Sequence, residues 1–525
     1  MNSQSSSNFG KWMALTAALL GWLFDGLEMG LFPLVQRPAL RELLATTTAD
    51  GTLIPVSEAE VNRWIGIITA FFLIGAATGG VLFGWLGDRI GRVRSMMLSV
   101  ITYALVSAMC GFANEAWQVG VLRFIAALGM GGEWSLGVAL INEIWPARSR
   151  AFLAGLIGAA ANVGYLIIAL AGLGLIKQVG QVRGLLESMS LPGHWIESLL
   201  ANDGWRFLMM LGALPALLTF FIRMFVPESE KWLHEKEKGA TSYWATHDLF
   251  SVLGGAAAAC GIIALWAFDA VPIPLAIIGS VVGFVLVTIG YIYPVMRYLQ
   301  RVRAAAGPGP VTVTNNPLKL MLLAACLSGI ALLGTWGSTQ QAPAIANKMV
   351  SDARTAEAKA KGVDEKQLDP APPAASYTQL STAAGAVIGT IIAALVGNWL
   401  GRRITYFLLC ISSFAILQVF LLTIHEFGDL FLVVAFFAGA ITASFYGWLP
   451  LYLPELFPTA IRATGQGFGF NFGRVIAAIG VLQLGNLSTA IGGLPQACAA
   501  LSFIYFAGMV VIWFVPETKG QPLPD

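Results

Sequence analysis

The chain has 525 residues, of which 57% are hydrophobic and 11% charged, and its mean hydropathy is +0.72. A soluble chain carries about 25% charged residues, so this composition excludes a soluble protein and indicates one that is integral to a membrane. The net charge is +2 without a basic block or acidic tail, which excludes a nucleic-acid partner. The five cysteines stand singly in apolar runs and the four histidines in loops or at span ends, so we expect no disulfide framework, metal site or cofactor.

Apolar runs of roughly 20 residues recur about fourteen times, which predicts an all-α integral membrane protein with about fourteen spans in the lipid bilayer. The polar N-terminus leads into a run that contains acidic residues, unlike a cleaved signal peptide. Arginines gather in alternate short loops, and the positive-inside rule then places both termini in the cytoplasm and the protein in a plasma (inner) membrane. The two long hydrophilic segments on the outer side, near 36–61 and 342–376, are expected to be solvated loops.

The first apolar run contains two acidic residues, Asp25 and Glu28, in the stretch WLFDGLEMGLF. Residues three apart on a helix share a face and lie about 4.5 Å apart along the axis. Two carboxylates this close in a medium of low dielectric should not both ionise, so we predict that the two share a bound proton. A structural ion pair with a neighbouring helix is the alternative.

The fourth run, near 117–141, contains Arg123 and Glu133. A charge near the bilayer centre costs at least about 2.5–3.5 kcal/mol on insertion scales, so both are candidate functional residues. If the first run crosses outward and the fourth inward, Arg123 and Glu28 lie at similar depth, and we predict that they pair, either reversibly or as a permanent salt bridge. Glu133 lies about 15 Å deeper, beyond direct reach of Arg123, and is either a second proton site or a buried anchor.

Two further apolar runs, near 249–268 and 272–295, have no counterpart elsewhere in the chain. We interpret them as a hairpin inserted between two groups of about six spans. The predicted domains are an N-terminal six-span half at 1–230, a cytoplasmic linker with the inserted hairpin at 231–316, and a C-terminal six-span half at 317–525.

The second half carries Asn471 and Arg474 in the stretch FGFNFGR, near the centre of an apolar run. An arginine facing the carboxylates of the first half is the residue we expect to hold a substrate carboxylate through a planar two-point contact. The alternative is an arginine that caps helix carbonyls or bridges to another helix. Gln340, Gln341 and Tyr446 are further candidates for a polar lining.

The two halves repeat one another in their loops. NEIWPARSRA at 142–151 is echoed by PELFPTAIRA at 454–463, so that Glu143, Pro146 and Arg150 each recur 312 residues later. VPES at 226–229 recurs as VPET at 515–518, and GWLGDRIGR at 84–92 has a shortened echo, GNWLGRR, at 397–403. Two parallel halves are typical of a rocker-type transporter with its site between them at the midplane.

GWLGDRIGR, LRFIAALGMGGEW, GWRFLMMLGALPALL with VPESEKW, and the final VPETKG together resemble the major facilitator superfamily. GGEW followed by NEIWPARSRA is most similar to the sialate and monocarboxylate proton symporters, and the loop motifs also resemble sugar porters. This resemblance implies a twelve-helix core in two six-helix halves, alternating access and proton coupling. Asp25 and Arg123 match intramembrane residues of sugar porters.

The resemblance also implies a set of cytoplasmic salt bridges that close the outward-open state. The matching loop residues are Asp88, Arg92, Glu143, Arg150, Glu228, Arg402, Glu455, Arg462 and Glu517. Two departures bear on the substrate: GLIGAAANVG lacks the glutamine that holds a sugar hydroxyl in sugar porters, and Trp336–Gln340 reads WGSTQ where monocarboxylate carriers have a histidine-containing run. Hexose is therefore disfavoured.

We predict a secondary active transporter, not an enzyme, that acts as a monomer and imports a small organic anion, a monocarboxylate or sugar acid, with protons. The alternatives are a sugar or polyol proton symporter, a multidrug or metabolite exporter of the same fold, and a transporter-like sensor. An enzyme would need a catalytic cluster, and the sequence contains no Ser/His/Asp, HExxH or paired-cysteine arrangement.

Overall fold

The computed structural model describes residues 8–47, 53–54, 56–267, 271–306, 316–364, 367–369 and 371–524. The first half of the molecule is formed by α1 (Asn8–Leu43), α2 (Glu58–Ile90), α3 (Arg92–Met109), α4 (Ala116–Ile144), α5 (Arg150–Ser188), α6 (Gly193–Leu200), α7 (Trp205–Leu211) and α8 (Leu218–Phe225).

The connection between the halves contains α9 (Glu230–Glu237) and the long pair α10 (Leu249–Ala267) and α11 (Ile273–Ala306). The second half is formed by α12 (Pro317–Trp336), α13 (Ala342–Lys361), α14 (Ala374–Leu400), α15 (Arg402–Thr423), α16 (Asp429–Ala443), α17 (Phe445–Tyr452), α18 (Arg462–Asn471), α19 (Gly473–Ala490), α20 (Leu494–Leu501) and α21 (Ile504–Val511).

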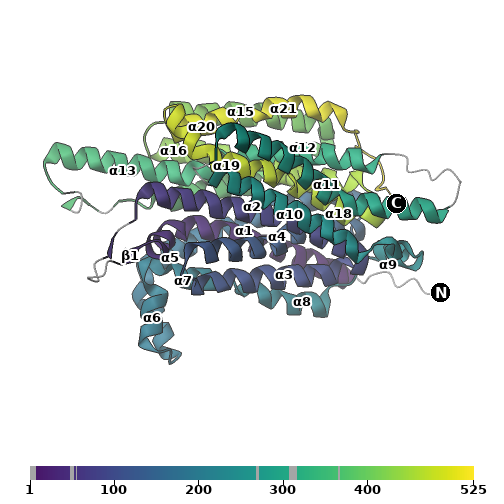
Figure 1. Ribbon diagram of the computed structural model, residues 1–525, viewed down its shortest axis with the longest axis horizontal. Coiled ribbons are helices and arrows are strands. Elements are labelled where there is room, and N and C mark those ends of the chain that lie inside the picture. Colours follow the sequence, from purple (N-terminus) through teal and green to yellow (C-terminus); the bar gives the residue numbers. More distant parts are fainter. Residues whose placement is uncertain are drawn as a thin grey trace.

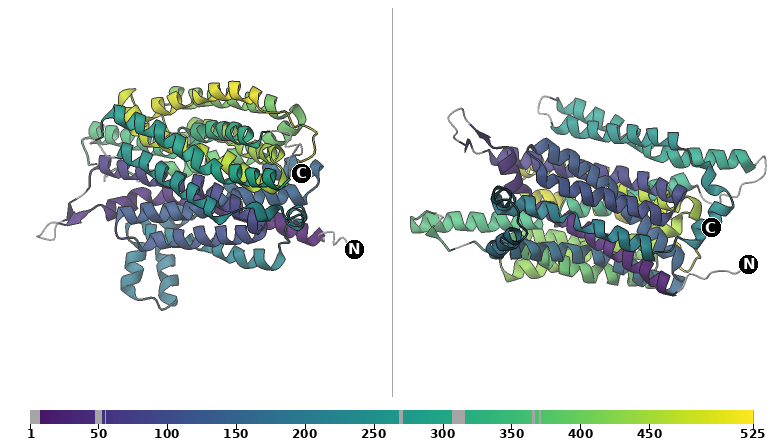
Figure 2. Two further views of the ribbon diagram at one scale, coloured as in Figure 1. Left: turned by 45° about the vertical axis from the view of Figure 1, so that its right-hand side comes forward. Right: turned by 90° about the horizontal axis from the view of Figure 1, so that it is seen from below.

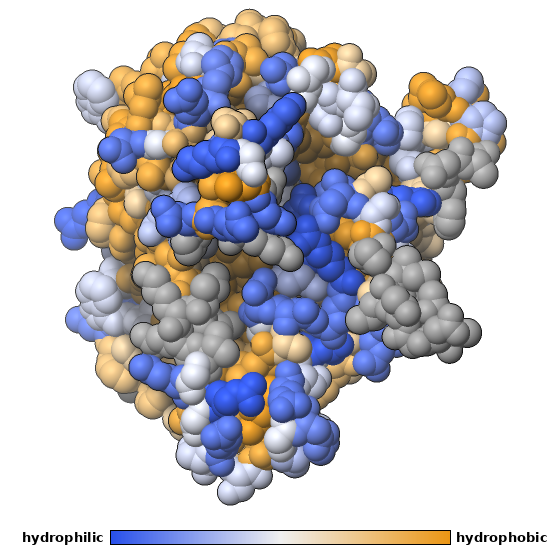
Figure 3. Space-filling view, turned by 90° about the vertical axis from the view of Figure 1, so that its left-hand side faces the viewer, coloured by the Kyte–Doolittle hydropathy of each residue, from blue (hydrophilic) through white to orange (hydrophobic). Residues whose placement is uncertain are grey.

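The long helices run side by side, with the first half on one side of the bundle and the second half on the other (Figure 1). The start of α1 and the segment after α21 lie at the same end of the bundle, which we call the terminal end, and α6 and α13 lie at the opposite, far end (Figure 2). Seen from the far end, hydrophilic side chains cover much of the end face, whereas the flanks are largely hydrophobic (Figure 3). This distribution fits a bundle whose flanks contact lipid.

Thirteen helical segments of the described chain are long and apolar enough to cross a membrane. A further apolar segment, residues 205–225, forms α7, the short helix η4 (Leu214–Leu217) and α8 instead of one continuous helix. Proline at position 215 interrupts the hydrogen bonding of a regular helix, which accounts for the break. The all-α membrane architecture predicted from the sequence is confirmed.

The two segments expected to be loops contain regular structure. In the first, α1 continues to Leu43 and is followed by the short antiparallel strands β1 (Thr46–Thr47) and β2 (Leu53–Ile54). In the second, α13 forms because its sequence is rich in alanine and lysine, which favour helix. Pairs four residues apart, Lys348 with Asp352 at 2.9 Å and Lys361 with Glu357 at 2.5 Å, support its exposed surface.

Glycines allow the closest helix contacts of the first half. A Cβ atom at Gly79 of α2 would lie 1.9 Å from the carbonyl oxygen of Leu128 in α4, and one at Gly131 of α4 would lie 2.0 Å from that of Ala76 in α2. In lipid, where apolar burial does not drive association, such backbone approach supplies the packing contacts. α2 and α4 therefore form a firm frame for the charged residues that they carry.

The pair α10–α11 packs along the outside of α2 (Figure 2). The hydroxyls of Tyr291 in α11 and Thr78 in α2 are 2.6 Å apart and buried. Phe284 and Tyr291 also pack against Phe472, between α18 and α19, with ring centroids 5.3 and 6.2 Å apart. The hairpin thus contacts both halves of the molecule.

Candidate functional site

Glu28 and Arg123 form a buried ion pair between α1 and α4, so the contact predicted from their depth is present. Arg123 Nη1 donates to Glu28 Oε1, and the Ser107 hydroxyl of α3 donates to the same oxygen at 2.7 Å. The guanidinium carbon of Arg123 lies 4.5 and 5.0 Å from the ring centroids of Phe72 and Phe32. One oxygen of Glu28 therefore accepts from both a cation and a hydroxyl.

Asp25 contacts Glu133 of α4, and we call these two residues the carboxyl pair. Glu133 fits against Gly21 of α1, where a Cβ atom would lie only 1.7 Å from Glu133 Oε1. Asp25 Oδ1 and both Glu133 oxygens are buried and accept no hydrogen bond from a donor in the described chain, so a bond between the two carboxyls requires a proton on one of them. Tyr103 of α3 lies beside Glu133.

Asp25 and Glu28, which the sequence analysis expected to share a proton, have different hydrogen-bonding neighbours. Although the two residues are three apart on α1, Glu28 is engaged by Arg123 and Ser107, while Asp25 faces Glu133. The structure therefore separates an ion pair from a pair of carboxyls within one helical turn.

Arg474, near the start of α19, is buried opposite the carboxyl pair. It lies near Asp25, Tyr446 and Tyr165, and its guanidinium carbon is 5.6 Å from the ring centroid of Phe470. Nε and Nη1 are buried without a hydrogen-bond partner in the part of the chain that the structure describes. Buried charges are normally paired and hydrogen-bonded, so this cation has unused capacity to bind an anion.

Aromatic rings join the two halves beside these charges. Trp134, the residue after Glu133, stacks on Phe470 with centroids 3.9 Å apart and planes inclined by 10°. The ring centroids of Trp22 in α1 and Trp134 are 6.1 Å apart, and those of Tyr446 in α17 and Phe470 are 6.3 Å apart. The sequence analysis did not select Trp134 or Phe470, because aromatic residues are common throughout its apolar runs.

The other predicted lining residues have defined partners. Asn471 Nδ2 donates to the carbonyl oxygens of Gly131 at 3.0 Å and Gly467 at 3.1 Å, so it ties α18 to α4. Gln341 Nε2 donates to the carbonyl oxygen of Trp336 at 3.0 Å, so it caps the end of α12.

Tyr446 and Gln340 face other polar side chains. The Tyr446 hydroxyl donates to Thr335 Oγ1 at 3.0 Å, and Gln340 lies beside Tyr165. Gln379 of α14 was not selected, yet its Nε2 is buried without a partner among the described residues and lies 3.0 Å from a Cβ placed on Gly30. A polar residue in the apolar run after Pro373 was the signal that could have identified it.

At the terminal end, Arg92 is the centre of a buried network in the first half. It donates to Asp88 at 2.5 Å, to Glu143 at 3.1 Å and to the Gly87 carbonyl at 2.8 Å. Glu228 accepts the backbone N–H of Arg92 at 3.0 Å, and burial raises its pKa. These contacts bring together four of the predicted gate residues.

The same network crosses to the second half. Arg462 donates to Glu143 at 3.0 Å, and Arg92 donates to the carbonyl oxygen of Thr459 at 3.0 Å. Asp88 accepts the backbone N–H groups of Ala463 and Thr464, at 3.2 and 2.9 Å, at the start of α18. A carboxylate at a helix N-terminus is favoured by the unsatisfied N–H groups and the helix dipole. The terminal end is closed along this seam between α2 and α18.

A second network lies within the second half. Arg402 donates to both oxygens of Glu455, at 2.7 and 2.9 Å, and to the Gly397 carbonyl at 2.7 Å, while Glu517 accepts its backbone N–H at 3.0 Å. The second network repeats the first with the same spacing, because Arg402 follows Gly397 by five residues as Arg92 follows Gly87. The second copy of the loop motif is therefore not shortened, contrary to the expectation from the sequence. Arg150 is not brought into either network by a hydrogen bond, and its Nε is buried without a partner among the described residues.

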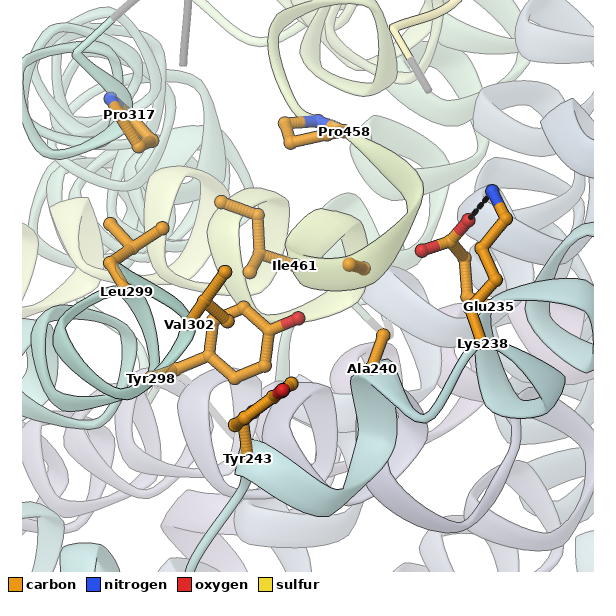
Figure 4. A pocket seen from close by; sticks show the side chains of 11 residues that line it. Glu235, Lys238, Ala240, Tyr243, Tyr298, Leu299, Val302, Pro317, Pro458 and Ile461 are labelled. Atoms are coloured by element: carbon orange, nitrogen blue, oxygen red, sulfur yellow. Dashed lines mark hydrogen bonds and ion pairs between the residues drawn. The ribbon is translucent and has the colours of Figure 1, made fainter. Parts of the chain in front are cut away.

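A separate cavity of about 270 Å³ lies at the terminal end between the connection and η10 (Thr459–Ile461) (Figure 4). Tyr243, Tyr298 and Ile461 line it, and the Glu235–Lys238 ion pair, 3.0 Å long, stands at one side. It contains none of the buried charges described above. The candidate functional site is therefore the buried centre between the halves and not this cavity.

Two helical halves that enclose buried charges and close one end with ion pairs define a secondary transporter of the two-half type. Residues 13–246 and 373–525 match the family described as sugar (and other) transporters. The chain therefore belongs to this transporter family of the major facilitator superfamily and is not an enzyme.

Relatives and solved structures agree with this assignment. The chain is 25% identical over 517 residues to a putative metabolite transport protein of Haemophilus influenzae, which covers 98% of both chains. It is 24% identical over 468 residues to the cis,cis-muconate transport protein of Acinetobacter baylyi, covering 87% of this chain and 86% of the relative. The structure of the proton:xylose symporter XylE superposes with a TM-score of 0.60 at 18% identity, covering 98% of each chain, and shows the common fold.

Proposed function

We propose that this transporter imports a small organic anion together with protons by alternating access. The observation that carries the proposal is Arg474, a buried cation opposite the carboxyl pair with two nitrogens that have no hydrogen-bond partner among the described residues. A guanidinium presents paired N–H groups that match a carboxylate. An organic anion would neutralise Arg474 in the low-dielectric centre, where an unpaired charge is costly.

The carboxyl pair supplies the proposed proton site. Asp25 and Glu133 can form a hydrogen bond only while one carries a proton, and loss of that proton leaves two buried negative charges in contact. Release of the proton would therefore favour separation of α1 from α4 or attraction of Asp25 toward Arg474. Proton binding and anion binding would be linked through these three residues.

The muconate relative is consistent with a carboxylate substrate, because cis,cis-muconate is a dicarboxylate. The fold shared with XylE keeps a sugar or polyol as the second candidate. We further propose that both termini are cytoplasmic, that the protein lies in an inner membrane as a monomer, and that the terminal-end networks form the cytoplasmic gate. Export and sensing remain rival functions of the same fold.

Uptake of a labelled panel of carboxylates and sugars into proteoliposomes, with and without an acid-outside gradient, tests the substrate class. We expect a carboxylate to accumulate, Arg474→Lys to weaken its binding at least about tenfold, and the matched change Arg94→Lys at an exposed site to leave it unchanged. Equal binding of the free acid and its ester would refute the anion assignment.

The coupling role of the carboxyl pair needs a second assay. Glutamine at position 133 keeps a hydrogen-bonding side chain but cannot release a proton. We expect Glu133→Gln and Asp25→Asn to exchange substrate across the membrane but not to concentrate it, because exchange needs no net proton movement. Gradient-driven accumulation at the wild-type level in both variants would show that the pair does not couple.

A further inference from the structure

A crevice of about 320 Å³ lies between α2, α4 and the inserted α10, near the far end of the bundle. Its lining runs from Glu60 to Phe71 along α2, which corresponds to about 16 Å of helix. Because α10 forms one wall, the crevice exists only where the hairpin stands against the first half. Its lining includes neither Arg474 nor the carboxyl pair.

The walls of the crevice are apolar and open to the flank of the bundle. Ile67 and Phe71 of α2, Val121 of α4 and Ile263 of α10 line it, and the side chain of Val121 is 48% exposed. Water would find few hydrogen-bonding partners at such walls, whereas hydrocarbon loses nothing on entering. The volume corresponds to about ten water-sized groups at roughly 30 Å³ each, so it suits part of one extended acyl chain.

The far-end rim of the crevice carries one charge of each sign. Glu60 and Arg63, in the first turns of α2, both have side chains 39% exposed, and Arg63 Nη1 is 3.6 Å from Glu60 Oε2. Arg63 Nη2 also donates to the carbonyl oxygen of Ala267 at 2.6 Å, at the end of α10. The rim therefore joins the first half to the hairpin at the place where the crevice opens.

Two tryptophans mark this rim as an interfacial site. Trp64 Nε1 donates to Glu60 Oε1 at 3.0 Å, and Trp117 at the start of α4 is 57% exposed. Tryptophan is enriched at the level of lipid headgroups, where its ring is in hydrocarbon and its N–H can reach polar groups. The apolar crevice thus lies directly below a polar rim at headgroup depth.

We propose that this crevice binds a zwitterionic phospholipid with a primary ammonium, of the phosphatidylethanolamine type. One acyl chain occupies the space between α2, α4 and α10, the phosphate faces Arg63, and the ammonium donates to Glu60. Glu60 and Arg63 already balance each other, so a headgroup that carries both signs keeps the rim neutral. An anionic headgroup without the ammonium would add an uncompensated negative charge beside Glu60, and a quaternary ammonium could not donate a hydrogen bond to it. The bound lipid fills the joint between the inserted hairpin and the first half.

Native mass spectrometry of the delipidated full-length protein tests this site. The protein is titrated with phosphatidylethanolamine, phosphatidylglycerol and phosphatidylcholine that carry identical acyl chains. We expect one phosphatidylethanolamine to be retained with about tenfold preference over the other two, the effect of one charge-assisted contact. Equal retention of the three lipids would overturn the proposal.

Two alanines of α10 provide a matched pair of variants. Ala264 lines the crevice, whereas Ala257, two turns away on the same face and likewise exposed, does not. Ala264→Phe should abolish the retained lipid, and Ala257→Phe should keep it, with both variants matching the wild type in elution and thermal unfolding. Glu60→Gln should remove the preference for phosphatidylethanolamine while lipid is still bound. Retention unchanged in Ala264→Phe would place the lipid elsewhere and refute the site.

Discussion

At Gly91 and Gly401 the backbone makes the same turn twice, with φ of 113° and 101°. After each glycine an arginine turns back to a carbonyl oxygen five residues before it, Arg92 to Gly87 and Arg402 to Gly397. The next partners match as well. In the first copy, Glu143 accepts from Arg92 and from the Ser229 hydroxyl, and Glu228 accepts the backbone N–H of Arg92. In the second copy, Glu455 accepts from Arg402 and from the Thr518 hydroxyl, and Glu517 accepts the backbone N–H of Arg402.

The two copies differ in what they do across the seam between the halves. In the first copy Asp88 is buried and caps α18, whereas the second copy has Asn398 at the equivalent position, and this side chain is exposed. Glu143 holds arginines from both halves, but the described contacts of Glu455 stay within the second half.

A second seam between the halves lies where α5 meets α14 and α17, and it is closely packed. A Cβ at Gly155 of α5 would lie 2.8 Å from the Cα of Ile391 in α14, and one at Gly158 would lie 2.7 Å from the carbonyl oxygen of Tyr446 in α17. Close glycine packing is common to both seams, since a Cβ at Gly467 of α18 would lie 2.2 Å from the carbonyl oxygen of Gly80 in α2. Among the described residues, only the first seam has an ion pair across it. A duplicated motif can keep its backbone geometry while only one copy retains the groups that join the halves.

The largest difference between the copies is expected in the stability lost when the arginine-binding glutamate, Glu143 or Glu455, is replaced. Glu143→Gln leaves Arg92 and Arg462, both inaccessible to solvent, with one carboxylate fewer, and breaking a buried pair costs about 3–5 kcal/mol. Glu455→Gln affects one arginine and should cost less. Thermal unfolding of both purified variants measures the order, and equal losses would mean that the crossing contact adds nothing.

The crossing carboxylate itself can be tested by making the first copy resemble the second. Asp88→Asn should weaken the α2–α18 seam by about 2 kcal/mol, roughly a thirtyfold change in the ratio of open to closed molecules. Alkylation of a cysteine placed at the buried Ser135, in a background without native cysteines, reports this opening.

Asn398→Ala is the control, because its exposed side chain makes no contact across the seam that the structure describes. It should leave the alkylation rate unchanged. A rate in Asp88→Asn no faster than in Asn398→Ala would show that Asp88 does not hold the seam, and a changed choice of solute would place it in the binding site instead.

The two turn glycines allow a finer comparison. Alanine at either position adopts an unfavourable positive φ, which costs about 1–3 kcal/mol. At Gly91 the added Cβ would also lie 2.3 Å from Glu228 Oε2, compared with 3.1 Å from Glu517 Oε2 at Gly401. Gly91→Ala should therefore lower the unfolding temperature more than Gly401→Ala, and the reverse order would contradict the geometry.

The smallest expected effect is a difference in pH dependence between Glu228 and Glu517. Burial raises the pKa of Glu228 above 4.5, so the folded protein binds this proton more tightly than the unfolded chain does. Stability therefore falls as the pH rises from 4.5 through the pKa of Glu228 in the folded protein. Burial also acts to raise the pKa of Glu517, but the backbone N–H groups of Arg402, Arg403 and Lys519 and the Arg402 charge outweigh it and lower that pKa. The stabilisation from Glu517 is present above pH 4.5 and is lost as the pH falls through the pKa of Glu517 in the folded protein.

Unfolding temperatures of Glu228→Gln and Glu517→Gln, measured across this pH range, separate the two glutamates. Relative to wild type, Glu228→Gln should gain stability with rising pH, and Glu517→Gln should lose its relative deficit in acid. Parallel curves for the two variants would contradict the opposite pKa shifts.

The sequence predicted the contacts that depend on depth and repetition. Glu28 and Arg123 meet because helix rise and crossing direction fix their heights. The predicted gate residues other than Arg150 meet in two networks, one at each copy of the duplicated motif. The partner of Asp25 depends instead on how α1 is rotated against α4 and on the space that Gly21 leaves for Glu133. Stacking of Trp134 on Phe470 likewise depends on how the halves dock, which no local pattern encodes.

The burial of the Asp88–Arg92–Glu143–Arg462 network bears on how the transporter responds to the ionic strength of its surroundings. Exposed ion pairs weaken as salt rises, because mobile ions screen charges over about 8 Å at physiological ionic strength. The paired side chains of Asp88, Arg92, Glu143 and Arg462 have no solvent-accessible surface, so dissolved ions cannot enter between them. The closed seam therefore keeps its strength when the osmotic conditions of the cell change.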